Sequence, residues 1–275
     1  MGLKNLENAF WESIEKETKG LSSAAVLFSG GLDSSVIAKG ISCKIKHTVL
    51  FCAGLQGSQD LIVARKSAER MNLPIVERIV ETEEIPQALS IVKKILAGKK
   101  LSQPLNLQIG VSEYFAFQAA KQAGFETVFM GQGADELFAG YDAFRKIVKE
   151  KGLNAVNAEC RKFLQKAERI DLKRDKAIAK HFGLELRLPF TEKDFVKVAL
   201  EIPAREKIHS EKDLLRKHAL RKLAGRIGVP KISRERPKKA MQYGSGIGKS
   251  LRKLIKEDIQ APSSFPASPK SGKAH

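Results

Sequence analysis

In the first half of the chain, short runs that are almost entirely apolar alternate with segments whose apolar residues recur at helical spacing. Four short runs are apolar almost throughout, which is typical of strands buried on both faces of a parallel sheet. These runs cover residues 24–28, 47–53, 73–80 and 127–130. Apolar positions around and between the runs recur at helical spacing. The helices predicted from this spacing cover residues 5–19, 34–41, 61–71, 85–97 and 109–123. Strands that alternate with helices predict an α/β fold with a doubly wound parallel sheet.

The second half of the chain has a different pattern. Strand signals almost vanish from Asp142 onward, and the apolar spacing there is helical. The predicted helices cover residues 144–151, 155–170, 172–182, 195–201, 213–224 and 248–259. We therefore expect an α/β region over residues 1–142 and a helical region over residues 143–260 that packs on it. Residues 261–275, rich in proline, serine and lysine, are expected to form a disordered tail.

Glycine-rich loops follow the first, second and fourth predicted strands. Ligands of open α/β sheets bind beyond the carboxyl ends of the strands, so these loops are expected to converge on one site. Residues 29–35 read Ser-Gly-Gly-Leu-Asp-Ser-Ser and lead into a predicted helix. Adjacent glycines let backbone N–H groups face a ligand, and the helix N-terminus adds unpaired donors and partial positive charge. We expect this loop to bind phosphate through Ser29, Gly30, Gly31 and Ser34. The alternative is a plain strand–helix turn.

Two acidic residues in the loops are candidate metal ligands. Asp33 cannot attract a phosphate directly, but it can hold Mg²⁺ that bridges phosphate oxygens. Asp135 lies in the loop after the fourth strand and supplies a second carboxylate. Carboxylates from two different loops suit Mg²⁺, which keeps several waters and takes phosphate oxygens as further ligands. A plain helix cap is the alternative for Asp135.

Several stretches resemble a known superfamily. The Ser-Gly-Gly-x-Asp-Ser loop is similar to the pyrophosphate-binding (PP) loop of the N-type ATP pyrophosphatases, which cleave ATP between the α and β phosphates. Residues 131–141, Gly-Gln-Gly-Ala-Asp-Glu-Leu-Phe-Ala-Gly-Tyr, resemble the Gly-Glu-Gly-Ser-Asp-Glu-Leu/Val-Phe-Gly-Gly-Tyr signature of asparagine synthetases and β-lactam synthetases. Residues 184–190 are similar to that family's Val-Glu-Ala-Arg-Val-Pro-Phe, and residues 213–216 resemble its Lys-x-x-Leu-Arg segment.

The resemblance implies an adenine nucleotide alpha hydrolase-like fold, ATP and Mg²⁺ as cofactors, and further site residues. The adenine and ribose side is implied to consist of Phe28, Ala53, Met130 and Gly131. Lys238, in an Arg-x-Lys motif, would offset charge as pyrophosphate leaves; the alternative is one more solvated lysine on a lysine-rich surface. Glu185 has either a catalytic role toward the substrate or a structural role as a buried ion pair with Arg187.

The resemblance also implies the reaction of an amide-forming ligase. A small-molecule carboxylate, aspartate or an analogue, would attack the α-phosphate to give an acyl-adenylate and pyrophosphate. Ammonia or an amine would then displace AMP. Two departures bear on the substrate. Gln132 replaces a family glutamate, and a neutral amide cannot act as a general base. Residues 105–112 fill the place of the loop that holds aspartate and contain no arginine for a carboxylate.

The nitrogen donor is a separate question. Glutamine-dependent members of the family have a glutaminase domain whose nucleophile is a cysteine at position two, whereas this sequence has Gly2 and only about 20 residues before the first strand. We therefore expect no glutaminase domain in this chain. The nitrogen would come from free ammonia, another amine or a separate glutaminase subunit. A nucleotide-binding partner subunit of such a glutaminase is an alternative function.

Composition opens one further alternative. Lysine and arginine outnumber aspartate and glutamate by 49 to 31, which gives a formal net charge of +18. Such an excess permits nucleic-acid binding, so a tRNA-modifying adenylating enzyme of the same superfamily is a second interpretation. Aromatic residues, at 7%, are few for RNA recognition.

Cysteine usage and hydropathy limit the cellular locations that we expect for the protein. The three cysteines form no Cys-x-x-Cys pair, which argues against a disulfide framework or structural zinc. No apolar run is long enough for a membrane span, and the N-terminus has no signal-peptide core. We expect a cytoplasmic protein. Its oligomeric state stays open, with a homodimer among the alternatives.

Overall fold

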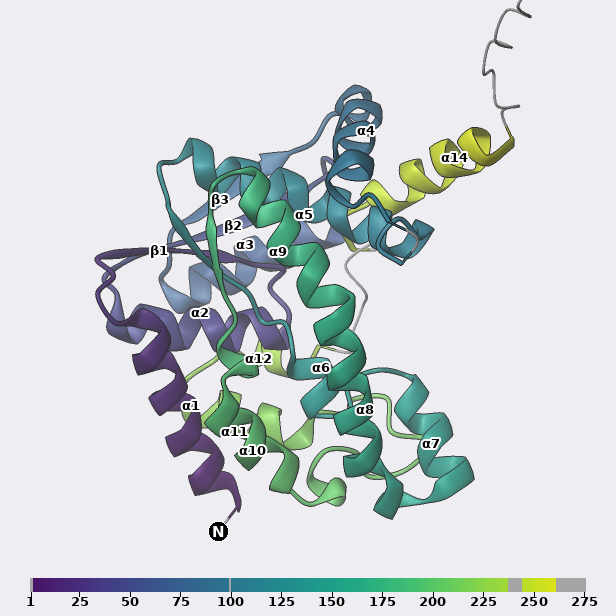
Figure 1. Cartoon of the computed structure of the whole chain (residues 1–275). Coiled ribbons are helices and arrows are strands. Elements are labelled where there is room, and N and C mark those ends of the chain that lie inside the picture. Colours follow the sequence, from purple (N-terminus) through teal and green to yellow (C-terminus); the bar gives the residue numbers. More distant parts are fainter. Residues whose placement is uncertain (1, 99, 237–243, 261–275) are drawn as a thin grey trace, which may run out of the picture.

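A five-stranded sheet forms the centre of the molecule (Figure 1). The computed structural model describes residues 2–98, 100–236 and 244–260. All strand pairs are parallel, in the order β3-β2-β1-β4-β5. The strands are β1 (Ser23–Leu27), β2 (His47–Gly54), β3 (Ile75–Ile79), β4 (Thr127–Phe129) and β5 (Glu185–Arg187). The predicted doubly wound α/β fold is therefore confirmed.

Both faces of the sheet are buried, which explains why the strand runs are apolar almost throughout. On β1, Val26 belongs to the core on one side and Leu27 to the core on the other. Val26 lies beside Leu50 of β2 and Phe129 of β4, and all three residues face the same core. This register aligns the carboxyl ends of β1 and β4, from which two of the glycine-rich loops depart.

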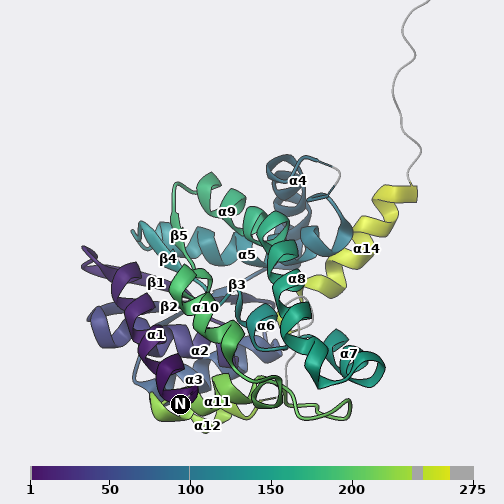
Figure 2. The same ribbon diagram turned by 60° about the horizontal axis from the view of Figure 1, so that its bottom comes forward.

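Helices supply most of the rest of the two cores (Figures 1 and 2). One core includes buried side chains of α1 (Gly2–Thr18), α2 (Leu32–Lys44), α3 (Gln59–Met71), α10 (Lys193–Glu201) and α11 (His218–Arg226). The other includes side chains of α4 (Ile85–Ile95), α5 (Pro104–Gln122), α9 (Asp171–His181) and α14 (Ile247–Gln260). The sheet is therefore enclosed between two helical layers.

The remaining described helices are α6 (Ala134–Leu137), α7 (Ala143–Lys151), α8 (Val156–Arg169) and α12 (Lys231–Arg234), with short 3-10 turns at Thr82–Glu84, Leu153–Ala155, Pro189–Thr191 and Ala204–Glu206. They differ in their places, since α6 adds Ala134 and Leu137 to the first core whereas α7 lies with a separate cluster. Figure 1 shows α7 and α8 at the bottom of the view, away from the strands. A small separate apolar cluster lies there and includes Phe144, Val156 and Cys160. The predicted helical layer of the second half is thus present.

Three expectations about individual elements were wrong. The second half contributes a strand, β5, which extends the sheet next to β4; its single apolar residue, Leu186, is too little for a strand pattern. Residues 105–112 do not form a loop but lie in α5, which begins at Pro104 because proline suits the first turn of a helix. The helix expected from Asp213 begins only at His218.

Two predictions concern parts of the chain that the structure does not describe. The tail over residues 261–275 and Lys238 both lie outside the described residues. Among the described helices, none is long and apolar enough to cross a membrane.

Candidate active site

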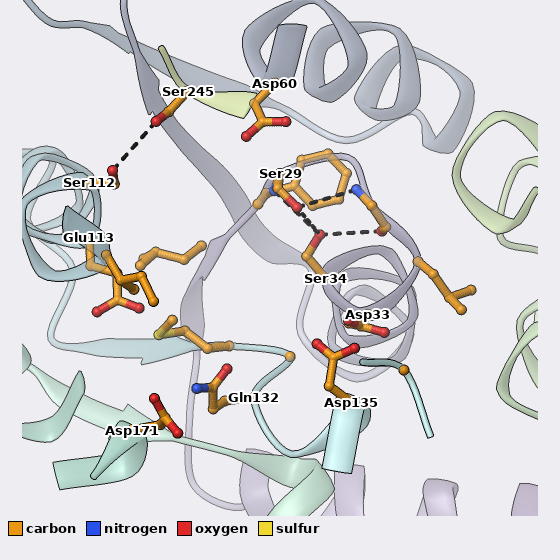
Figure 3. A pocket seen from close by; sticks show the side chains of 18 of the residues that line it. Ser29, Asp33, Ser34, Asp60, Ser112, Glu113, Gln132, Asp135, Asp171 and Ser245 are labelled. Atoms are coloured by element: carbon orange, nitrogen blue, oxygen red, sulfur yellow. Dashed lines mark hydrogen bonds between the residues drawn. The ribbon is translucent and has the colours of Figure 1, made fainter. Parts of the chain in front are cut away.

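A cavity of about 570 Å³ opens at the carboxyl ends of β1 and β4. The chain leaves β1 toward β2 on one side and returns to β4 on the other, so this is the topological switch point of the sheet. The loops after β1 and β4 both line the cavity, together with residues of α5, the α8–α9 junction and the segment before α11. Figure 3 shows side chains of the loops after β1 and β4, of α5 and of the start of α9 converging on one space.

Ser29 and Ser34 close the loop after β1 on itself. The Oγ atom of Ser34 accepts a hydrogen bond from the backbone N–H of Ser29 at 3.3 Å and lies 3.3 Å from the Ser29 Oγ (Figure 3). Helix α2 begins directly after Gly31, and no side chain caps its first turn. The N–H groups of that turn are therefore donors available to an anion.

Gly30 shapes this loop from behind the cavity. Its φ of +67° lies in the left-handed region, and a Cβ there would lie 2.8 Å from backbone atoms of Val63 and Ala64 in α3. Glycine is therefore required for the loop to pack against α3. Gly30 is not among the residues that line the cavity, and its predicted contact with phosphate stays a prediction.

Asp33 and Asp135 meet at a third residue, Lys217. The Lys217 Nζ lies 2.7 and 2.6 Å from the two carboxylate oxygens of Asp33 and 2.7 Å from Oδ1 of Asp135. The Lys217 side chain is only 4% exposed. Burial lowers the pKa of Lys217, while the charge of Asp33 opposes that shift. One ammonium group therefore joins carboxylates from the two predicted metal-binding loops.

The backbone around Lys217 is shaped to admit it. Arg216 and Lys217 have φ values of +45° and +55°, which are uncommon for residues with a Cβ. The carboxylate of Asp213 supports this turn, since its Oδ1 accepts hydrogen bonds from the N–H groups of Leu215 and Arg216 at 3.0 Å. A Cβ on Gly140 would lie 2.1 Å from Cε of Lys217. The late start of α11 is the consequence of this turn.

The Arg-x-Lys segment approaches the phosphate loop through its arginine. Arg236 donates to the carbonyl oxygen of Ser29 at 3.4 Å and pairs with Asp60 at 3.2 Å. Asp60, at the start of α3, is buried and lines the cavity. The lysine of the motif, Lys238, lies outside the described residues.

The other end of the cavity contains a buried charge cluster. Figure 3 shows Glu113, Gln132 and Asp171 there, apart from Asp33 and Asp135. Arg174 of α9 pairs with Asp171 at 2.8 Å, Asp175 at 2.7 Å and Glu113 at 3.5 Å. Burial raises the pKa of Glu113 well above its usual range, and the neighbouring Asp175 raises it further. Burial also raises the pKa of Asp175, against the effect of Arg174.

This cluster changes the picture of residues 105–112. That stretch has no arginine of its own, yet its Asn106 accepts a hydrogen bond from Arg174 at 3.1 Å. The helical layer therefore brings a guanidinium to this end of the cavity. Carboxylates already engage that guanidinium, so it is held in place by the protein itself.

Most predicted site residues line the cavity. They are Phe28, Ser29, Gly31, Asp33, Ser34, Ala53, Met130, Gly131, Gln132 and Asp135. Glu185 is not among the lining residues. It lies on the edge strand β5, where its carboxylate accepts two hydrogen bonds from Arg187 at 2.9 and 3.1 Å. This ion pair exists but is not buried, because the Glu185 side chain is 57% exposed.

Sequence reasoning missed Lys217, Glu113 and Arg174. Lys217 directly follows the Lys-x-x-Leu-Arg segment, but nothing local distinguishes it from a surface lysine. Arg174 offers a usable signal, since it lies on α9 between the buried positions Leu172 and Ile178. A charged residue at a core position of a helix indicates a buried partner.

The fold and the site together define an asparagine synthetase-like domain. A family model described as asparagine synthase matches residues 5–166 and 148–270, and the chain belongs to that family. The chain is 31% identical over 92% of its length to a protein of Methanocaldococcus jannaschii provisionally named a glutamine-hydrolyzing asparagine synthetase, of which it covers 51%.

Two eukaryotic relatives give the same picture. The chain is 28% identical to glutamine-hydrolyzing asparagine synthetases of Arabidopsis thaliana and Homo sapiens. The alignments cover 82% and 93% of this chain, and 40% and 46% of those proteins. The chain thus spans about half the length of the curated relatives it matches.

Proposed function

We propose that this domain is a Mg-ATP-dependent, amide-forming ligase that activates a carboxylate as an acyl-adenylate and releases AMP and pyrophosphate. One observation carries the proposal. Asp33 and Asp135, from loops after two different strands, converge within 2.7 Å of a single cationic nitrogen beside the phosphate loop. An arrangement that already gathers carboxylate oxygens around one cation suits Mg²⁺, whose ligands are oxygens.

The proposed roles of the chain's residues follow from their places in the cavity. Asp33 and Asp135 would hold Mg²⁺, which when bound neutralises charge on the phosphate oxygens. Ser29, Ser34 and the first turn of α2 would bind the leaving pyrophosphate. The adenosine would lie against Phe28, Ala53 and Met130. Lys238, outside the described residues, stays our proposal for the cation that stabilises developing charge at the α-phosphate.

The carboxylate substrate would bind at the end of the cavity that contains Gln132 and Asp171. Aspartate or an analogue is the proposed substrate, because the relatives are named asparagine synthetases. Gln132 can orient a carbonyl or an amine by hydrogen bonding, but it cannot remove a proton from ammonium. The nucleophile would therefore enter as free ammonia or as a neutral amine, from solution or from a glutaminase.

Product analysis tests the proposal. The chain is incubated with ATP, Mg²⁺, aspartate and ammonium, and nucleotides and amino acids are separated. We expect AMP, pyrophosphate and asparagine in equal amounts. Formation of ADP would overturn the acyl-adenylate mechanism, and AMP without asparagine would overturn aspartate as the substrate. Turnover by the purified chain with ammonium would rule out a role as an inactive partner of a glutaminase.

A matched pair of variants connects the reaction to the site. Asp135→Asn should lower kcat/KM for ATP by about 100-fold or more, which corresponds to about 2.7 kcal/mol of transition-state stabilisation. Asp194→Asn is the control, because Asp194 is 67% exposed and pairs with Lys16 on the surface. Its activity should equal that of the wild type.

One observation favours the second candidate, a tRNA-modifying adenylating enzyme. Helices α8 and α9 have exposed basic residues whose spacing averages one helical turn. They are Lys162, Lys166, Arg169, Lys173, Lys176 and Lys180. One of these residues, Lys166, also lines the cavity. Binding of tRNA on filters between 50 and 200 mM salt tests this candidate, since phosphate contacts make affinity fall steeply with salt. Absence of binding at 50 mM salt would remove it.

A further inference from the structure

The ammonium of Lys217 occupies the point where the two proposed metal ligands meet. Three carboxylate oxygens of Asp33 and Asp135 surround its Nζ at 2.6–2.7 Å. An ammonium group has three donors, so these oxygens can use all of them. A metal ion that binds both carboxylates must take the place of this nitrogen. Lys217 and a bound metal ion therefore compete for the same two side chains.

The placement of Lys217 is built into the fold. Left-handed backbone at Arg216 and Lys217 turns the chain toward the cavity, and the glycine at position 140 leaves space for the lysine side chain. Arg216 fixes the turn from the other side, because its Nε donates to the carbonyl oxygen of Gly140 at 3.0 Å. A flexible surface lysine that met the carboxylates by chance would need none of these features.

The charges around Lys217 decide when a metal ion can replace its ammonium group between Asp33 and Asp135. Asp33 and Asp135 carry two negative charges against one positive charge from Lys217. A metal ion alone would have to displace a buried ammonium group, since the side chain of Lys217 is only 4% exposed. A nucleotide brings phosphate oxygens to the loop containing Ser29 and Ser34, and these oxygens can receive the displaced ammonium.

We propose that Lys217 couples metal binding to nucleotide binding by holding Asp33 and Asp135 until the phosphates of ATP receive its ammonium group. This inference rests on the metal site of the proposed function. It makes Lys217 a positioning residue that suppresses binding of a metal ion without nucleotide.

The affinity of the protein for Mn²⁺ tests the proposal without turnover. It is measured from the electron paramagnetic resonance signal of the Mn²⁺ that remains free in solution. The full chain is titrated with Mn²⁺ alone and with Mn²⁺ plus α,β-methylene-ATP, which cannot be cleaved at the bond between the α and β phosphates. Binding of Mn²⁺ to the analogue itself is measured separately. We expect the wild type to bind Mn²⁺ about tenfold or more tightly with the analogue than without it.

Substitution of Lys217 should remove this dependence. Lys217→Met is expected to bind Mn²⁺ alone about tenfold or more tightly than the wild type, and the double variant with Asp135→Asn should lose that gain. Lys207→Met is the matched control, because Lys207 is also fully buried but lies near Cys160. The affinity of the Lys207→Met protein for Mn²⁺ should equal that of the wild type. Lys217→Gln, which keeps a polar group, serves if the methionine variant does not fold.

Two results separate the failure of this inference from that of the proposed function. A folded Lys217→Met or Lys217→Gln protein that binds Mn²⁺ no more tightly than the wild type would overturn the inference, even if the wild type forms AMP and pyrophosphate. Release of ADP by the wild type would overturn the proposed reaction, while the Mn²⁺ titrations would still decide the competition between Lys217 and the metal ion.

Discussion

Gly131 packs directly against the backbone of Asp33. A Cβ at position 131 would lie 2.8 Å from the carbonyl carbon of Asp33 and 2.9 Å from its Cβ. The two residues follow neighbouring strands, β4 and β1, at the switch point of the sheet. The close approach of these two loops is what allows carboxylates on both of them to reach a single cation.

This approach predicts a large effect of Gly131→Ala. The new methyl group meets backbone atoms, which cannot rotate away, so the loops must separate. We expect a loss of about 1–3 kcal/mol in the free energy of unfolding and a loss of ligase activity of about tenfold or more. Urea denaturation and the product assay measure the two effects.

Gly225→Ala is the matched control for this substitution. Gly225 lies within α11, and the atoms nearest to a Cβ there belong to the flexible side chain of Arg234. Alanine is a better helix former than glycine, so we expect equal or greater stability and unchanged activity. Unaltered activity of Gly131→Ala would show that the close approach of the loops does not matter for the site.

The part of the site that sequence could predict is local. The phosphate loop and the loop with Asp135 each combine a strand end, glycines and an acidic residue within a few positions. Lys217 is 184 residues from Asp33 and joins it only in the folded chain, through a left-handed turn that no sequence pattern marks. The sheet was predictable because four of its strands are local apolar runs, whereas β5 has a single apolar residue, Leu186, between Glu185 and Arg187.

Gln132 allows a prediction about the second half of the proposed reaction. Gln132→Glu introduces a carboxylate that can accept a proton from the attacking nitrogen, which an amide cannot. We expect faster asparagine formation with ammonium at pH 7, while ATP–pyrophosphate exchange, which reports only adenylate formation, should change less than about tenfold. Gln132→Met is the control and should slow amide formation. Equal rates of amide formation in all three proteins would exclude a role of residue 132 in that step.

Arg174 is expected to be essential for stability. It is 1% exposed and is the shared partner of Glu113 and Asp175, which are 2% and 0% exposed. Arg174→Met removes the cation that pairs with both carboxyls, and breaking a buried pair in this way costs about 3–5 kcal/mol. The exposed neighbour provides the control, since Lys173→Met should change the free energy of unfolding by less than about 0.5 kcal/mol.

The same variant should show a characteristic pH dependence. Burial already raises the pKa of Glu113 and Asp175, and loss of Arg174 removes the effect that opposes this shift. An acid whose pKa is raised on folding binds more protons in the folded state than in the unfolded state. The free energy of unfolding therefore falls as the pH rises above the pKa that the acid has in the unfolded chain. The deficit of Arg174→Met should therefore be smaller at pH 5 than at pH 7. An equal or larger deficit at pH 5 would contradict the assignment of these groups as the origin of the loss.

Lys207 leads to the opposite expectation, a stabilising substitution. Its side chain is fully buried, and its Nζ has no hydrogen-bond partner among the described residues. Burial lowers the pKa of Lys207 from 10.5 to about 8. A base whose pKa is lowered on folding destabilises the folded state, and this penalty is fully present below the folded-state pKa. The penalty disappears as the pH rises to the pKa of the base in the unfolded chain. Lys207→Met should therefore stabilise the protein at pH 7 by about 2–3 kcal/mol.

The pH dependence of this gain distinguishes removal of a buried charge from better packing. Between pH 8 and pH 10.5 the wild type should gain stability relative to Lys207→Met, because its lysine becomes neutral in the folded state before it does so in the unfolded state. Urea midpoints of both proteins at pH 7 and pH 10 measure this convergence. Lys212→Met, which removes an exposed cation, should show neither the gain nor its pH dependence. A gain of equal size at both pH values would mean that methionine packing, and not the charge of Lys207, is responsible.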